Sequence, residues 1–95
     1  MKIDHIALVV DEPTLAAKWY ECNFNAEVLY SDDSWAMAEF ENIKIAFVKK
    51  GAHPTHIAFE VENFDDTEGK EKTHRDGSKS VYKSDPWGNI YELIN

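Results

Sequence analysis

Two histidines occupy the same place in two near-copies of a short apolar phrase. Residues 4–10 read DHIALVV and contain His5, and residues 55–61 read THIAFEV and contain His56. Both copies are rich in apolar and β-branched residues, which predicts two buried strands that each carry one histidine. If the copies pack about a pseudo-twofold axis, equivalent positions converge and the two imidazoles can meet over one ligand.

A second repeat adds a carboxylate to this pair. Residues 40–47 read FENIKIAF and residues 87–94 read WGNIYELI, with asparagine at the third place of each. The sixth place is then Ile45 in the first copy and Glu92 in the second. Two histidines and one carboxylate suit Fe(II), Mn(II), Ni(II) or Zn(II), and three protein ligands leave coordination positions for substrate or water. The repeats therefore predict a divalent-metal site formed by both histidines and Glu92.

A structural interpretation of the same residues stands beside the metal site. A single histidine on an apolar strand is most often a core residue that is hydrogen-bonded to the backbone. Glu92 follows Ile90 and Tyr91 and precedes two more apolar residues, so it either faces solvent or requires a buried partner, because an unpaired buried charge is costly. A metal ion is one such partner. The coincidence of two equivalent histidines with this glutamate favours the metal site.

The elements that must carry these side chains are mostly strands. Period-two alternation predicts a strand over 3–10 with His5 and Ala7 on one face. Asp11-Glu12-Pro13 is a helix-start signal, and apolar residues at helical spacing predict a helix over 13–23 that packs on the sheet. Further strands are predicted over residues 26–31, 34–40, 43–49, 55–61, 80–83 and 89–94.

These elements predict an α+β fold in which two repeated β-α-β-β-β modules form a cupped mixed sheet within one domain, residues 1–95. Module one spans 1–50 and module two spans 51–95. The second module is expected to be shortened, because residues 62–79 are polar, show no apolar stripe and predict only a short helix or an ordered loop. Such a module would leave the cup open on one side, so a homodimer is expected to close it.

Composition excludes several classes of function. The chain has 10 basic and 18 acidic residues, and a net charge of −8 disfavours nucleic acid and anionic membranes as partners. No apolar run approaches the roughly 20 residues of a membrane span. The absence of a signal-peptide pattern and the single cysteine, Cys22, predict a cytoplasmic location.

Several motifs together resemble the vicinal oxygen chelate superfamily, which includes glyoxalase I, fosfomycin-resistance proteins, extradiol dioxygenases, methylmalonyl-CoA epimerase and bleomycin-resistance proteins. Residues 4–10 are similar to the family's opening strand, and Trp19-Tyr20-Glu21 to the aromatic pair late in its first helix. Residues 55–61 are similar to the opening of its second module. Residues 85–93, DPWGNIYEL, resemble its closing motif and are the most specific element.

The resemblance implies a metal on His5, His56 and Glu92 that is chelated by two neighbouring oxygens of a small substrate. The family's chemistry is electrophilic, since the metal stabilises an oxyanion, an enolate or bound dioxygen. An alternative is a metal-free protein that sequesters a small molecule, as bleomycin-resistance proteins do. A third is a degenerate relative that retains only interaction with a partner.

Two positions depart from the family pattern. Ile45 stands where glyoxalase I and the epimerase-like members have a fourth ligand that can also act as a base. Ala7 stands where the fosfomycin-resistance enzymes have a threonine. Glu92 and Glu60 are the candidate catalytic residues: Glu60 lies on the strand face of His56 and is either a general base or a solvated carboxylate at the rim.

Other side chains have less specific interpretations. His53, in the linker, is predicted to be solvated. Four large side chains could line an apolar ligand pocket, or be plain core or dimer contacts. They are Trp35, Met37, Tyr82 and Trp87.

Overall fold

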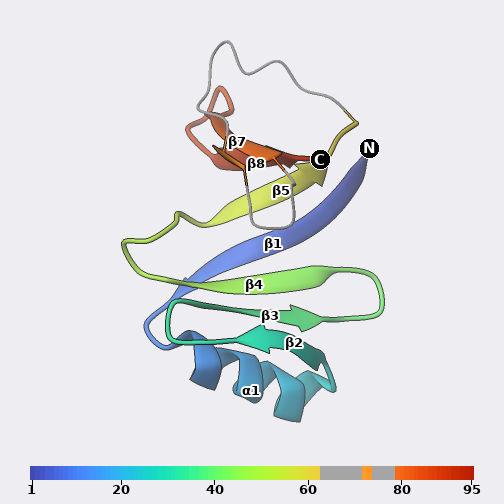
Figure 1. Cartoon of the computed structure of the whole chain (residues 1–95), viewed down its shortest axis with the longest axis vertical. Coiled ribbons are helices and arrows are strands. Elements are labelled where there is room, and N and C mark those ends of the chain that lie inside the picture. Colours follow the sequence, from blue (N-terminus) through green and yellow to red (C-terminus); the bar gives the residue numbers. More distant parts are fainter. Residues whose placement is uncertain (63–71, 74–78) are drawn as a thin grey trace.

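A computed structural model describes residues 1–62, 72–73 and 79–95, and all of the described strands lie in one mixed sheet with a helix packed against it (Figure 1). The sheet has eight strands in the order β2-β3-β4-β1-β5-β8-β7-β6. The elements are β1 Lys2–Val10, α1 Pro13–Phe24, β2 Glu27–Ser31, β3 Trp35–Glu39, β4 Lys44–Lys49, β5 His56–Glu60, β6 Lys72–Thr73, β7 Lys79–Ser84 and β8 Ile90–Ile94.

The strand order is symmetric about the centre of the sheet. β1 pairs with β4 in parallel, β5 pairs with β8 in parallel, and the two halves join through the antiparallel pair β1·β5. Each half then continues outward through two antiparallel pairs, β4·β3·β2 and β8·β7·β6. This arrangement confirms the predicted α+β fold with a repeated module.

Within the described residues, the outer strand of the second half, β6, has two residues, whereas the equivalent strand β2 has five. This short strand was not predicted, because a two-residue pairing leaves no periodic signal in the sequence. The rest of the short helix or loop predicted for 62–79 lies almost entirely outside the described residues.

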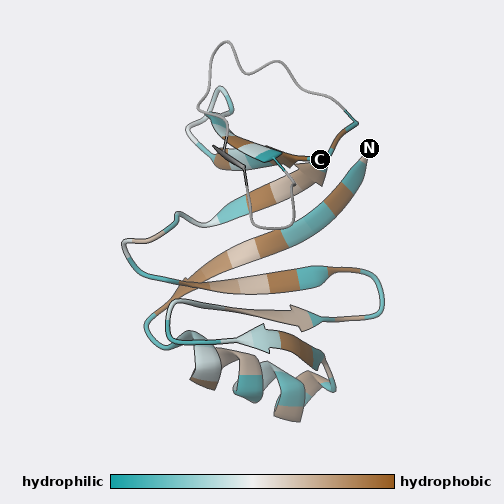
Figure 2. Cartoon of the chain, in the orientation of Figure 1, coloured by the Kyte–Doolittle hydropathy of each residue, from teal (hydrophilic) through white to brown (hydrophobic). Residues whose placement is uncertain are grey.

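Local sequence explains why the first half folds as it does. β1 begins with polar and apolar residues and continues as an apolar run, which Figure 2 shows as teal and brown bands followed by a mostly brown stretch. Pro13 begins α1 in the first helical turn, where its missing N–H costs nothing, and Glu12 makes no side-chain cap. The helix ends at Asn25, which adopts the left-handed conformation (φ 58°) and donates its N–H to the carbonyl of Glu21.

The two faces of the sheet have different roles. One face packs on α1 through a cluster of small side chains around the fully buried Phe47. The other face, which we call the inner face, carries Ala7, Ala46 and Val48 with Met37 packed beside them. Small residues thus occupy the inner face next to the two histidines.

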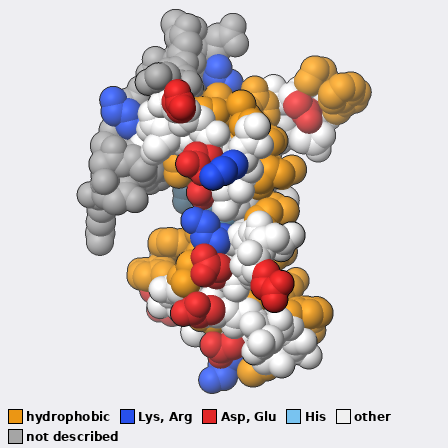
Figure 3. Space-filling model, turned by 90° about the vertical axis from the view of Figure 1, so that its right-hand side faces the viewer, with side chains coloured by type: hydrophobic (Ala, Val, Ile, Leu, Met, Phe, Trp, Pro, Cys, Tyr) orange, Lys and Arg blue, Asp and Glu red, His pale blue; other side chains and the backbone are white. Residues whose placement is uncertain are grey.

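The surface is mixed in charge. On the face seen in Figure 3, acidic and basic side chains are interspersed, and hydrophobic side chains gather along one edge. Within the described residues, no helix combines the length and the apolar character needed to cross a bilayer.

Candidate metal centre

Three neighbouring strands each bring one buried polar side chain to the same point on the inner face. His5 of β1 lies opposite Ala58 of β5, and Ala58 lies opposite Glu92 of β8. His56, two residues before Ala58, points to the same face. Only 8%, 4% and 4% of His5, His56 and Glu92 are exposed. One donor atom from each of the three lies within 4.8 Å of the others.

Both imidazoles approach the same carboxylate oxygen. The Nε2 atom of His5 is 3.5 Å from Oε1 of Glu92, and the Nε2 atom of His56 is 3.4 Å from that atom. The two rings meet edge to face, with centroids 5.6 Å apart. Nε2 of His56 is buried and makes no hydrogen bond. It lies within ion-pair distance of the Glu92 carboxylate, but the two groups are not aligned as hydrogen-bond donor and acceptor.

The far side of each ring is held by an acceptor. Nδ1 of His5 is 2.8 Å from Oδ2 of Asp4, and Nδ1 of His56 is 2.7 Å from the carbonyl oxygen of Pro54. From these acceptors we assign the proton of each neutral ring to Nδ1, so that Nε2 presents a lone pair to Glu92. Two lone pairs and a carboxylate oxygen repel one another, and the arrangement therefore requires a proton or a metal cation between them.

A β-bulge places Asp4 beside His5. The register of β1 against β5 shifts between Ile3 and His5, so Asp4 is the extra residue of the pair. A bulge re-aims the side chain that it displaces, and here the carboxylate turns toward the imidazole. Nζ of Lys44 lies 3.6 Å from the other Asp4 oxygen and partly balances its charge. Asp4 was not predicted from the sequence as part of the site, although its position directly before His5 could have identified it.

The ionisation of the centre follows from these contacts. Burial alone would lower the pKa of His56, but the Glu92 carboxylate and the Pro54 carbonyl raise it above 6.5. Burial alone would raise the pKa of Glu92, but His56, His5 and the hydroxyl of Ser80 lower it below 4.5. The pKa shifts of His56 and Glu92 thus run in opposite directions, and each group favours the charged form of the other.

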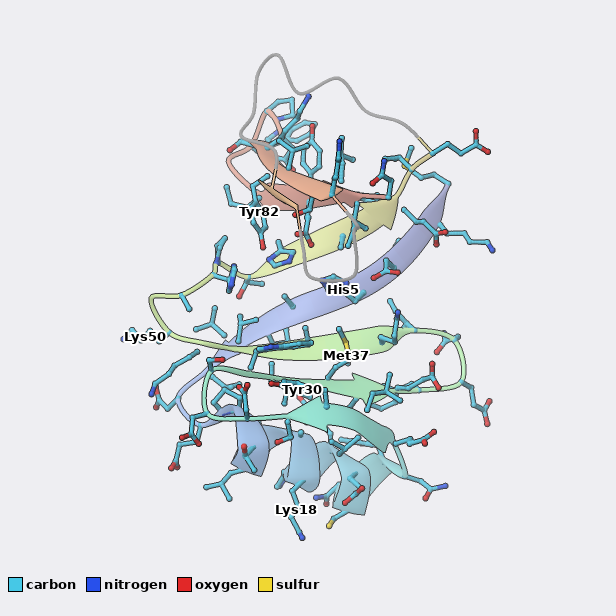
Figure 4. The ribbon with its side chains drawn as sticks, viewed as in Figure 1. His5, Lys18, Tyr30, Met37, Lys50 and Tyr82 are labelled. Atoms are coloured by element: carbon cyan, nitrogen blue, oxygen red, sulfur yellow. The ribbon has the colours of Figure 1, made fainter. Side chains whose placement is uncertain are left out.

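Tyr82 forms the next layer around the centre. It lies opposite Glu92 in the β7·β8 pair, and its ring meets the His56 ring edge to face with centroids 5.0 Å apart. Burial and then the negative charge of Glu92 raise the pKa of the Tyr82 phenol, so the hydroxyl is a donor at neutral pH. Tyr82 and His5 come from opposite sides of β5 (Figure 4).

The predicted solvation of His53 is wrong. The side chain is half-buried, and its Nδ1 atom lies 3.2 Å from the hydroxyl of Tyr82. No local signal links these residues, because 29 positions separate them in the sequence.

The donor set fits a divalent cation. Two ligands at about 2.1 Å from one ion lie roughly 3.0–3.4 Å apart, which is close to the separations of the two imidazoles from Glu92. Ligating histidines usually donate their second ring N–H to a carboxylate or a carbonyl, as His5 does to Asp4 and His56 to Pro54. The orphaned Nε2 of His56 is the atom that an ion would satisfy.

The alignment of Ile45 with Glu92 is wrong by one residue. In the β1·β4 pair Ala7 lies opposite Ala46, just as Ala58 lies opposite Glu92 in β5·β8, so Ala46 is the equivalent of Glu92. Ile45 instead packs on the helix-side cluster. The position for a fourth ligand is therefore filled by a buried alanine.

The remaining candidates lie outside the donor cluster. Glu60 is exposed, near the end of β5, opposite Lys2, so its role as a base stays a prediction. Trp87 is 83% exposed in the turn before β8 and does not line the centre. Trp35 stacks on Tyr30 with centroids 4.5 Å apart.

Comparison with known proteins gives a clear result only at the level of structure. No family model matches the sequence, and no curated protein matches it either. Solved structures do match. A Streptomyces coelicolor methylmalonyl-CoA epimerase variant in complex with 2-nitronate-propionyl-CoA is 17% identical, with a TM-score of 0.75 over 99% of this chain and 96% of that chain. The epimerase from Mycobacterium tuberculosis is 13% identical, with a TM-score of 0.77 over 98% and 86%.

A third structure carries a different name on the same fold. It is described as an NAD-dependent benzaldehyde dehydrogenase from Legionella pneumophila and is 14% identical, with a TM-score of 0.67 over 94% of this chain and 95% of that one. Methylmalonyl-CoA epimerases belong to the vicinal oxygen chelate superfamily, and the chain has the fold of that superfamily. At these identities the likeness establishes the fold and leaves the activity open.

Proposed function

We propose that the chain is a divalent-metal-dependent enzyme that acts on a small oxygenated substrate. His5, His56 and Glu92 would hold the metal. The observation that carries this proposal is the pair of Nε2 atoms, 3.5 and 3.4 Å from a single oxygen of Glu92, in a buried site with one of them unpaired. A bound divalent metal supplies Lewis-acid chemistry, in which it stabilises negative charge on a substrate oxygen.

The surrounding residues suit substrate binding at that place. Ala58 separates His5 from Glu92, and Ala7 lies opposite His56, so among the described residues the strand positions beside the three donors hold alanine. Three protein donors leave coordination positions that neighbouring oxygens of a substrate can take.

The likeness to methylmalonyl-CoA epimerases supports this class of function without selecting their reaction. Proton transfer beside a carbonyl needs a base within reach of the proton, and the first-half position equivalent to Glu92 holds Ala46, which cannot serve as a base. We therefore propose a metal-dependent reaction that uses three protein ligands, with Glu60 as an untested candidate base. A homodimer and a cytoplasmic location remain predictions.

A metal-free binding protein is the second candidate. The exposed aromatic stack of Tyr30 and Trp35 favours it, because such a surface can take an apolar ligand without a metal.

Metal content decides between these functions. Protein reloaded separately with Mn, Fe, Ni and Zn is analysed for bound metal, for wild type and for His5→Ala, Glu92→Gln and Glu60→Gln. We expect about one metal per chain in wild type, loss in His5→Ala and Glu92→Gln, and full content in Glu60→Gln, the matched control on an exposed glutamate. Absence of metal under every loading would favour the binding protein. Equal content in Glu92→Gln would place the metal elsewhere.

A further inference from the structure

We infer that His53 is a positioning residue for the metal centre, which acts through Tyr82 on His56 and Glu92. The inference rests on the proposed metal site, to which it assigns a supporting residue outside the ligand set. His53 lies in the linker between β4 and β5 and is half-buried. Its Nδ1 atom is 3.2 Å from the hydroxyl of Tyr82, and the ring centroids are 6.2 Å apart.

Tyr82 connects His53 to two of the three ligands. Its ring packs edge-on against His56, and its backbone position pairs with that of Glu92 on the same face of the sheet. A phenol ring held only by packing can turn about its side-chain bonds. A hydrogen bond at the distal hydroxyl fixes the ring and, with it, the wall against which His56 rests.

The hydrogen bond between His53 and Tyr82 can run in either direction, and the nearby Glu92 carboxylate favours one of them. A buried carboxylate is stabilised by donors, and Tyr82 has one proton to give. If Nδ1–H of His53 donates to the Tyr82 oxygen, the phenol proton is free to point toward Glu92. The opposite polarity would turn that proton toward His53 and away from the carboxylate.

Three substitutions at His53 separate positioning from general stability. Cobalt(II) is the probe: its affinity is measured by competition with a chelator, and its ligand geometry by the visible d–d spectrum. His53→Ala should weaken cobalt binding by about 3- to 10-fold and should shift the spectrum. The loss should be no larger than the roughly 10–100-fold that follows removal of a residue in direct contact with a metal ligand, because His53 acts through Tyr82. His53→Asn should restore both, because its amide N–H can replace Nδ1–H. His53→Gln, whose amide lies further out, should not.

A double substitution tests the route through Tyr82. In a Tyr82→Phe background, His53→Ala should cause no further loss of cobalt affinity, because the acceptor of its hydrogen bond has been removed. Additive losses, an unchanged His53→Ala protein, or equal rescue by asparagine and glutamine would each overturn the assignment of His53 while leaving the metal site intact. Failure of the wild-type chain to bind cobalt would instead overturn the proposed function, and the inference with it.

Discussion

Ala46 and Glu92 occupy equivalent positions in the two halves of the sheet, one opposite Ala7 and the other opposite Ala58. Both point to the inner face, and both are 4% exposed. The pseudo-symmetric site therefore has four places, of which three hold donors and the fourth holds a methyl group. A metal bound at this site would therefore have three protein ligands, and its other coordination positions would be open to substrate or water.

Ala46→Glu should add a fourth donor to the centre. We expect tighter metal binding, because the new carboxylate replaces solvent or substrate at the ion, and a loss of about 1–3 kcal/mol in the stability of the metal-free protein from overpacking. Calorimetric titration with Mn or Zn measures the first effect and thermal unfolding the second. Ile45→Glu is the control: it places a charge in the helix-side cluster and should destabilise the fold without tightening metal binding. Tighter binding in that control alone would mean that the register is wrong.

Asp4→Ala should weaken metal binding while leaving all three ligands in place. Asp4 accepts the Nδ1 proton of His5, which fixes the tautomer that presents Nε2. Loss of such a partner typically weakens metal affinity by about 10–100-fold. Asp11→Ala removes an exposed aspartate and is the matched control. Equal affinities in both variants would show that the bulge at Asp4 does not serve the centre.

The ligand pair should make the stability of the metal-free protein depend on pH. The lowered pKa of Glu92 contributes stability that is present above 4.5 and is lost as the pH falls through the folded-state pKa. The raised pKa of His56 contributes stability that is fully present below 6.5 and is lost as the pH rises through the folded-state pKa. The difference in melting temperature between wild type and Glu92→Gln should therefore be largest between these two values. A constant difference from pH 4 to pH 8 would contradict the proposed ion pair.

The affinity of the centre for a metal should fall at acidic pH. The ion must displace the proton held by His56, so affinity should fall as the pH drops through the raised pKa of that residue. Calorimetry in buffers of different ionisation enthalpy measures the protons released. Binding with no proton release at pH 6 would indicate that His56 is not a ligand.

Phe47→Ala should destabilise the fold by about 3–5 kcal/mol, because the side chain is fully buried at the centre of the helix-side cluster. Phe24→Ala removes the same ring from the exposed end of α1, where 55% of the residue is exposed, and should cost about 1 kcal/mol or less. Urea denaturation compares the two. Similar losses would mean that the core does not lie where the fold places it.

The sequence alone was sufficient for the described elements of four or more residues and for the three polar side chains that lie together on the inner face. Apolar runs rich in β-branched and aromatic residues, bounded by turn residues, predicted every described strand of four or more residues to within two residues, because these signals are local. The repeated phrase placed His5 and His56 at equivalent points for the same reason. Glu92 stood out because a charge among apolar neighbours needs a partner.

Only the tertiary structure decided how these donors are arranged and held. Register is set by pairing between distant strands, so a repeat alignment that looked natural was wrong by one residue and exchanged Ile45 for Ala46. The bulge at Asp4 and the contact between His53 and Tyr82 also arise from pairing across the sheet, and neither leaves a periodic trace in the chain. The sequence thus determined which residues could do chemistry, while the packing of the two halves determined which atoms face one another.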